Sequence, residues 1–178
     1  QAIDEATEKI HETVLRIESE PELGYKETKT AAKVESYMKE LGLTPQTGLA
    51  LTGVKTCVDG GKKGPAVAVL AELDAVGTPD SPKADPLTGA AHTCGHFLQM
   101  ASMLAACTGI VKSDVMKDLA GSAVFFAVPA EEYVEIDYRK RLVKEGKIHF
   151  LGGKSELVYE GHFDDIDMAM MMHSQGNA

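Results

Sequence analysis

Apolar residues recur at helical spacing in two segments of the first quarter of the chain. In residues 3–18 the apolar positions Ile10, Val14 and Ile17 lie three or four apart, which is the spacing of one face of an α-helix. Residues 28–41 repeat this pattern, and Gly42 follows with the backbone freedom that a helix end often needs. The pattern therefore predicts two successive amphipathic helices.

Two other segments are apolar without any alternation. Residues 67–71 read Val-Ala-Val-Leu-Ala, and residues 123–128 read Ala-Val-Phe-Phe-Ala-Val. Such runs are typical of strands that helices cover on both faces. Residues 96–108, which are dense in apolar side chains, predict a buried helix that joins these strands. We expect an α/β fold in which helices pack on both faces of a mixed, largely parallel sheet, with both strands in its middle.

Chain length and the remaining segments complete this expected architecture. At 178 residues the chain has the usual size of one domain with one hydrophobic core, so we expect residues 1–178 to form a single domain. Residues 77–89 are rich in Pro and Asp and predict a surface loop. Residues 132–147 predict a further helix, and residues 163–172 a further strand.

Charge and hydropathy argue against two classes of partner. Asp and Glu number 27 against 18 Lys and Arg, so the formal net charge is -9, which repels nucleic-acid backbones and anionic membrane surfaces. The longest apolar runs are far shorter than the ~20 residues needed to cross a bilayer. We therefore expect neither a nucleic-acid partner nor a membrane segment.

Cysteine usage indicates a compartment and singles out one thiol. Three cysteines, Cys57, Cys94 and Cys107, are too few and odd in number for a disulfide framework, so we expect a reducing environment and a soluble cytoplasmic protein. Residues 92–96, His-Thr-Cys-Gly-His, place Cys94 and His96 two positions apart where a loop turns into a helix. Both are metal-ligand types, and the glycine between them lets both side chains converge. A buried structural cysteine beside an unrelated histidine is the alternative.

Two adjacent carboxylates, Glu131 and Glu132, follow the second apolar strand. Catalytic groups in α/β sheets gather at the carboxyl ends of strands. Neighbouring carboxylates repel one another unless a cation or a shared proton offsets their charge, which makes them candidates for one metal ligand and one general base. A solvated acidic helix start, favoured by the helix dipole, is the alternative.

Two further residues are expected at the same edge of the sheet. Asp74 ends the first apolar strand and suits the role of holding a ligating imidazole in one tautomer, although a plain loop-capping aspartate fits as well. His173 follows residues 168–172 and would also lie at a strand end, as a ligand or as an ordinary packed or surface histidine. Four other histidines lack such a placement and are expected to be structural: His11, His92, His149 and His162.

Several ordered motifs extend this site over most of the chain. They lie at residues 21–28, 41–43, 52–54, 73–75, 92–96, 129–132 and 163–165. In content and order they resemble the amidohydrolase branch of the zinc-dependent aminoacylase and carboxypeptidase G family. That branch includes auxin-conjugate hydrolases, N-acetyl-diaminopimelate deacetylases and p-aminobenzoyl-glutamate hydrolases.

The resemblance implies a metallo-amidohydrolase that cleaves the amide bond of N-acyl amino acids, amino-acid conjugates or small peptides with metal-activated water. It implies metal ligands at Cys94, His96, Glu132 and His173, a general base at Glu131, and a supporting carboxylate at Asp74. It also implies divalent metal, two ions of zinc, manganese or cobalt per full-length subunit, and a homodimer.

Three features depart from that family's pattern. Phe97 stands where relatives commonly have Asp or Asn, and Tyr133 stands where many have glycine. The family's catalytic domain is longer, is interrupted by a lid and dimerisation domain, and has a final ligand histidine near its C-terminus. We therefore expect residues 1–178 to be the N-terminal part of such a domain, without the lid and the C-terminal part, and with exposed sheet surface that needs its missing half.

Two other functions compete with hydrolysis. A degenerate or truncated homologue could be a non-catalytic metal-binding or assembly module, which Phe97 and the chain length both motivate. A thiol nucleophile at Cys94 paired with His96 is the other, but neighbouring carboxylates do not help a thiolate form. The metal-dependent amidohydrolase is the leading hypothesis.

Overall fold

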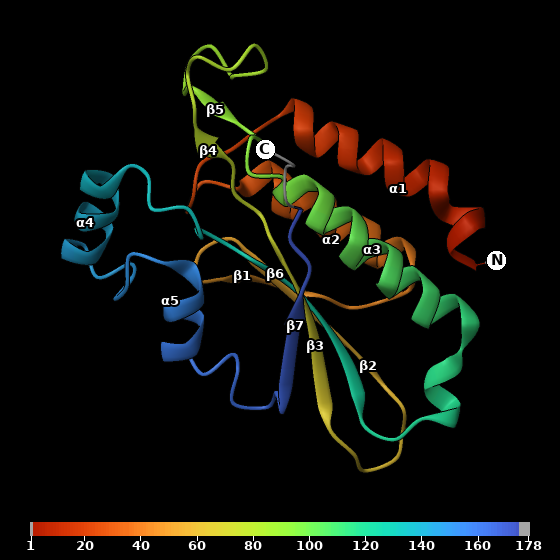
Figure 1. Cartoon of the computed structure of the whole chain (residues 1–178). Coiled ribbons are helices and arrows are strands. Elements are labelled where there is room, and N and C mark those ends of the chain that lie inside the picture. The colour runs from red at the N-terminus through yellow and green to blue at the C-terminus, as the bar shows by residue number, and fades with distance from the viewer. Residues whose placement is uncertain (1, 175–178) are drawn as a thin grey trace.

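The computed structural model describes residues 2–174 as an α/β fold (Figure 1). The helices are α1 (Ala2–Ser19), α2 (Thr28–Glu40), α3 (His96–Ser113), α4 (Ile136–Lys144) and α5 (Gly153–Tyr159), with a short 3-10 helix, η1 (Val115–Asp118). The strands are β1 (Gln46–Leu49), β2 (Gly53–Asp59), β3 (Ala66–Glu72), β4 (Val76–Gly77), β5 (Ala90–Ala91), β6 (Ser122–Val128) and β7 (Met168–Met171).

Five strands form one mixed sheet in the order β1-β2-β6-β3-β7. Strand β3 runs parallel to both of its neighbours, β6 and β7, whereas β1, β2 and β6 pair antiparallel. Strands β4 and β5 form a separate antiparallel pair that brackets most of the loop at residues 77–89. The predicted α/β fold is confirmed, and the two apolar runs are neighbouring strands in the interior of the sheet.

Helices pack on both faces of this sheet, as the unbroken apolar runs predicted. Helices α1, α2 and α3 lie on one side and α4 and α5 on the other (Figure 1). Phe125 and Phe126 are successive in β6 and fully buried, yet they enter two different hydrophobic clusters because side chains alternate across a strand. Phe125 packs with α1, α2 and α3, and Phe126 packs with Leu142 of α4 and Leu157 of α5.

Strands β1 and β2 and helix α5 are among the elements that the pattern of apolar residues missed. Strand β1 is mostly exposed, and β2 contains Lys55, which is buried because its Nζ donates to Asp165 Oδ1 and to the His162 carbonyl, each within 2.8 Å. Helix α5 is short and contains a buried carboxylate, Glu156, which accepts the backbone N–H groups of His149 and Phe150. Polar residues with buried partners hide the periodicity on which such predictions depend.

Two predicted elements are shorter than expected. The helix expected at residues 132–147 begins only at Ile136, because Glu135 before it has a left-handed backbone (φ 49°). The strand expected at residues 163–172 is confined to β7, and turns precede it. Among residues 2–174 there is no helix of the length and apolar character that crossing a bilayer requires.

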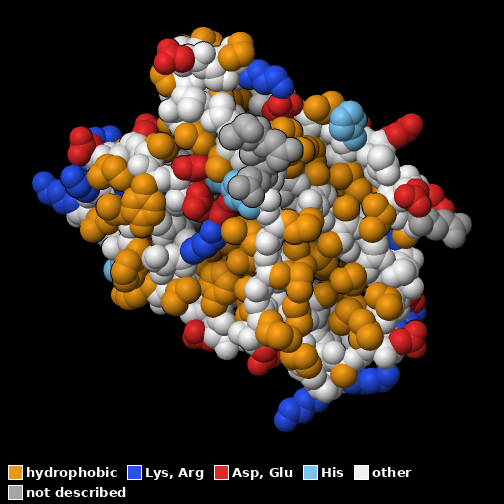
Figure 2. Space-filling view, in the orientation of Figure 1, with side chains coloured by type: hydrophobic (Ala, Val, Ile, Leu, Met, Phe, Trp, Pro, Cys, Tyr) orange, Lys and Arg blue, Asp and Glu red, His pale blue; other side chains and the backbone are white. Residues whose placement is uncertain are grey.

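Strand β7 lies at the edge of the sheet and leaves its side chains exposed. The exposed fractions of Met168 and Met170 are 54% and 58%. Figure 2 shows hydrophobic side chains gathered in the lower middle of the molecule, where β7 and β3 face the viewer. Unpaired strand edges and contiguous apolar surface are features that proteins normally cover.

Helix α3 offers a matched test of the core. Leu104 is fully buried in the cluster under α1 and α2, whereas Leu98 in the same helix is 46% exposed. We expect Leu104→Ala to lower the free energy of unfolding by about 3 kcal/mol because it leaves a cavity. Leu98→Ala should change it by about 0.5 kcal/mol or less. Chemical denaturation of both variants checks this, and equal effects would contradict the assigned burial.

Candidate metal centre

The parallel part of the sheet brings distant acidic residues and one histidine to a common edge. Because β3, β6 and β7 run parallel, their carboxyl ends lie at the same side of the molecule. Glu72 ends β3 and Asp74 follows it, Glu131 and Glu132 follow β6, and His173 lies two residues after β7. This is the edge at which α/β folds place ligands and catalytic groups.

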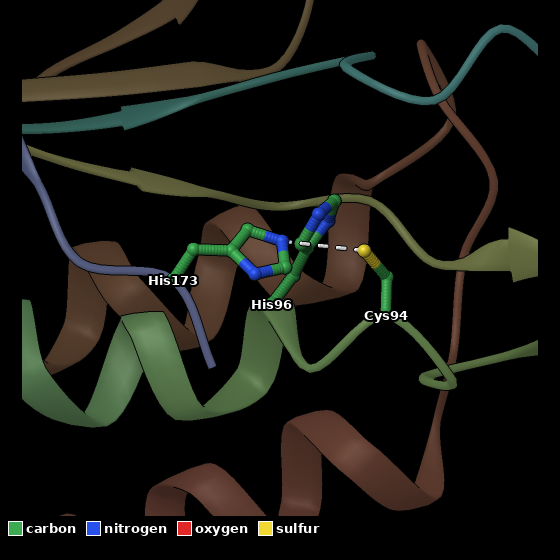
Figure 3. Close-up of side chains that lie close together, drawn as sticks. All are labelled: Cys94, His96 and His173. Atoms are coloured by element: carbon green, nitrogen blue, oxygen red, sulfur yellow. Dashed lines mark hydrogen bonds between the residues drawn. The ribbon is translucent and has the colours of Figure 1, made fainter. Parts of the chain in front are cut away.

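Cys94 and His96 enter the same place from the loop that precedes α3. Gly95 between them has φ 93°, a left-handed conformation that favours glycine, and it turns the chain into the helix. The Cys94 sulfur lies 3.3 Å from His173 Nε2, and the rings of His96 and His173 meet edge to face with centroids 5.9 Å apart. The donor atoms of all three residues lie within 4.8 Å of one another (Figure 3).

His96 is oriented by the end of β3. Its Nδ1 lies 2.8 Å from the backbone carbonyl oxygen of Asp74 and 3.3 Å from Asp74 Oδ1. A carbonyl only accepts hydrogen bonds, so Nδ1 carries a hydrogen, and Nε2 is the ring atom that faces the acidic cluster. An imidazole held in this way at one nitrogen is arranged to bind a metal through the other.

The far side of His96 is surrounded by carboxylates. Its Nε2 lies 2.9 Å from Glu72 Oε2 and 3.8 Å from both Glu131 Oε2 and Glu132 Oε1. Within residues 2–174 this buried nitrogen has no partner with hydrogen-bond geometry. Burial opposes a charged ring, but the interactions with Asp74 and Glu72 outweigh it and raise the pKa of His96 to about 11. The space between Nε2 and the carboxylates is therefore suited to a positive charge, a proton or a metal cation.

Glu72 also belongs to this cluster, in addition to the residues predicted from the sequence. Its side chain is 1% exposed, accepts a hydrogen bond from Gln99 Nε2 at 2.9 Å, and forms an ion pair with Lys154. Burial alone would raise its pKa, but His96, Lys154 and Gln99 lower it to about 2. The available signal was its position two residues before Asp74, since alternate positions of an extended chain face the same side.

The two glutamates after β6 differ in their surroundings. The Glu132 backbone N–H donates to Asp74 Oδ2 at 2.8 Å, so the ends of β3 and β6 are tied together. The Glu131 side chain is 39% exposed, and burial together with the charge of Glu72 raises its pKa above the usual value. Burial and the Glu132 carboxylate also raise the pKa of the Cys94 thiol, which disfavours a free thiolate nucleophile.

The donor set fits a divalent metal. Two groups of potential ligand atoms share His96: Cys94 with His96 and His173, and Glu72 with His96 and Glu131. Sulfur, imidazole nitrogen and carboxylate oxygen together suit zinc, cobalt or manganese. The structure thus brings all six predicted site residues to one edge of the sheet. Glu132 lies outside both groups, and its role as a ligand stays a prediction.

Three other histidines lie outside the candidate centre. His149 and His162 lie 3.0 Å from the carboxylates of Glu156 and Glu160. The ring nitrogens of His92 are buried without hydrogen-bond partners in the described part of the chain, and burial lowers its pKa to about 4. None of these three belongs to either group of potential metal ligands among residues 2–174.

Fold and site together define an α/β protein with a candidate metal centre at the carboxyl edge of its sheet, and comparisons place it among known proteins. No family model matches the chain. Thermostable carboxypeptidase 2 of Saccharolobus solfataricus is 32% identical over 136 residues, 74% of this chain and 34% of that protein. N-acetyl-L-cysteine deacetylase of Bacillus subtilis is 27% identical over 158 residues, 87% of this chain and 33% of that protein. Further relatives include IAA-amino acid hydrolases of Arabidopsis thaliana.

The fold comparison agrees with the sequence relatives. A crystal structure of a dinuclear metal-binding peptidase of the M20 family from Bacillus subtilis superposes with a TM-score of 0.74 at 22% identity, over 94% of this chain and 43% of that one. The chain spans about a third of the length of the curated relatives that it matches. It is a homologue of amidohydrolases, deacetylases and carboxypeptidases, which confirms the family resemblance of its motifs.

Cobalt binding tests whether Cys94 is a metal ligand, and Cys57 serves as the matched control. We expect Cys94→Ser to abolish the sulfur-to-cobalt charge-transfer absorption and to weaken Co²⁺ binding about tenfold or more. Cys57, an exposed thiol in β2, belongs to neither ligand group within residues 2–174, so Cys57→Ser should keep the wild-type spectrum. Absorption that survives in Cys94→Ser and vanishes in Cys57→Ser would refute the assignment.

A buried carboxyl beside this site gives a pH prediction. Glu27 is fully buried, and burial followed by the charge of Asp74 raises its pKa from 4.5 to about 7. Folding therefore favours the protonated form: its stabilising contribution is complete below pH 4.5 and is lost as the pH rises through 7. With a chelator present, the unfolding free energy of Glu27→Gln relative to wild type should increase by up to about 3 kcal/mol over this window. A flat difference in urea denaturation would contradict the raised pKa.

Proposed function

We propose that this chain carries the metal centre of a metal-dependent amidohydrolase. The substrates would be N-acyl amino acids, amino-acid conjugates or small peptides, whose amide bond is hydrolysed by activated water. The observation that carries the proposal is the meeting of the Cys94 sulfur, the His96 and His173 imidazoles and the two glutamates after β6 at one edge of the sheet. The relatives described as a deacetylase, carboxypeptidases and IAA-amino acid hydrolases support this substrate class.

The proposed ligands follow from the donor atoms. Cys94, His96, Glu132 and His173 would hold divalent metal, with two ions of zinc, manganese or cobalt in the complete subunit. A bound divalent ion supplies Lewis acidity toward the scissile carbonyl and lowers the pKa of water to ~7. The Asp74 backbone carbonyl fixes the His96 tautomer, and the Asp74 carboxylate holds the Glu132 backbone N–H.

Glu131 is the proposed general base. Its carboxylate lies at the cluster, 3.8 Å from His96 Nε2, and keeps 39% of its side chain open to solvent, so it can reach both water and substrate. Burial and the charge of Glu72 raise its pKa, which makes it a better proton acceptor than an ordinary surface glutamate. In this role Glu131 takes a proton from the attacking water and passes it to the departing amine.

The wider setting of the chain is part of the proposal. We place residues 1–178 in the N-terminal part of the catalytic domain, consistent with a match to about a third of each curated relative. The remaining catalytic-domain residues and a lid and dimerisation domain would complete a cytoplasmic homodimer. The net charge of -9 favours a small amide or dipeptide substrate over a nucleic acid.

Variants of the two neighbouring glutamates distinguish a role in proton transfer from a role in metal binding. In the complete protein, Glu131→Gln should retain the metal and lower kcat about 100-fold or more, because the proton acceptor is lost. Glu132→Gln should lose metal as well as activity. Amine release from a panel of N-acyl amino acids and dipeptides, with metal content measured by elemental analysis, distinguishes the variants.

Two outcomes would count against this function. A fully active Glu131→Gln protein would refute the assignment of the base. A wild-type protein that binds metal stoichiometrically and releases amine from no member of the panel would instead favour a non-catalytic metal-binding module.

A further inference from the structure

The two-residue junction between β6 and the glutamate pair contains one strained residue, Ala130. Ala130 has φ 52°, in the left-handed region that residues with a Cβ rarely adopt, and it directly precedes Glu131 and Glu132. Such a conformation persists only where the surrounding structure imposes it. The direction in which both carboxylates leave the sheet therefore depends on the contacts that hold Ala130.

Glu27 holds the N–H side of this junction. Its side chain is fully buried, and Oε1 accepts the Ala130 N–H at 2.7 Å while Oε2 accepts the Thr52 hydroxyl at 2.7 Å. Glu27 precedes α2, but its side chain makes no capping hydrogen bond to that helix. Glu22 instead accepts the N–H groups of the first turn. The buried carboxyl of Glu27 thus serves the loop after β6 and not its own helix.

Arg139 holds the carbonyl side. It lies in α4 and is fully buried, with its guanidinium 5.4 Å from the centre of the Tyr25 ring. Nη1 donates to the Ala130 carbonyl at 3.3 Å and to the Leu151 carbonyl at 2.7 Å, and Nη2 donates to the Glu132 carbonyl. No carboxylate among residues 2–174 forms an ion pair with this arginine. A buried cation is costly unless its donors are used. Nε of Arg139 has no hydrogen-bond partner within residues 2–174, whereas two of the three hydrogen bonds from its Nη atoms go to the loop that carries the glutamates.

Two further contacts complete the arrangement around the loop. The Gly153 N–H also donates to the Ala130 carbonyl, at 3.1 Å, and Asp74 Oδ2 accepts the Glu132 N–H at 2.8 Å. Backbone groups of both Ala130 and Glu132 are therefore fixed by elements far apart in sequence. Both glutamate carboxylates consequently end 3.8 Å from His96 Nε2.

We propose that Glu27 and Arg139 are positioning residues, which clamp Ala130 in its left-handed conformation and so aim Glu131 and Glu132 at His96. This inference rests on the proposed amidohydrolase function for its kinetic consequence. A misplacement of about 1 Å at a reacting group can cost ~100-fold in rate. The clamp should therefore act on kcat and on the geometry of the metal centre, with little effect on substrate binding.

The test uses the complete protein loaded with Co²⁺. Arg139→Met keeps the apolar stem and removes the donors, and Glu27→Ala removes the acceptor, while Glu27→Gln keeps a carbonyl that can accept the Ala130 N–H. Arg139→Met and Glu27→Ala should lower kcat about tenfold or more, leave KM within about twofold and shift the cobalt d–d bands. Glu27→Gln should recover most of kcat and the wild-type spectrum. Arg141→Met, an exposed change in the same helix, is the matched control.

The outcomes separate this inference from the function on which it rests. Wild-type kcat and cobalt spectra in both Arg139→Met and Glu27→Ala would overturn it. So would a loss of kcat that only follows the loss of folded protein, measured by circular dichroism, with an unchanged cobalt spectrum in the folded fraction. If wild type hydrolyses no substrate, the proposed function fails, but the cobalt spectra of the variants still decide whether the clamp shapes the centre.

Discussion

The candidate site depends on one constraint, the tie between the ends of β3 and β6 through Asp74. The backbone carbonyl of this residue fixes the His96 ring, and its carboxylate accepts the Glu132 N–H. Because β3 and β6 are paired in parallel register, this tie has little freedom. Backbone pairing therefore places Asp74 beside the loop after β6, and the hydrogen bonds of Asp74 then hold the His96 ring and the Glu132 backbone in one place.

Negative charge is concentrated at this edge, and its arrangement explains why the site is suited to a cation. Glu72 and Asp74 are buried, and the partly exposed Glu131 and Glu132 approach the same imidazole. Lys154, which forms an ion pair with Glu72, offsets part of this charge. Carboxylates desolvated together without a cation would raise one another's pKa values and destabilise the fold. A divalent ion bound here would relieve the same repulsion, and its binding would then be coupled to stability.

Much of the fold and most of the site could be predicted from local patterns. The unbroken apolar runs of β3 and β6 predicted buried strands, and the residues placed after them are those that meet at the sheet edge. Elements with buried polar groups could not be predicted this way. Lys55 in β2 is buried because Asp165, 110 positions away, accepts from its Nζ, and Glu156 in α5 is buried because it accepts backbone N–H groups from the segment before its helix. A pattern of apolar side chains contains no information on such polar partners.

The sequence by itself determined the α/β class, the order of the main elements and the chemical types at the site, because hydrophobic periodicity and strand-end position are local properties. Only the tertiary structure decided that Glu72 joins His96 at 2.9 Å, that Lys154 faces the same carboxylate, and that the left-handed Ala130 is held by Glu27 and Arg139. These contacts join residues separated by tens of positions or depend on a backbone angle that no residue type prescribes. They arise when the strands pair and the helices pack, and they set the direction in which the site residues point.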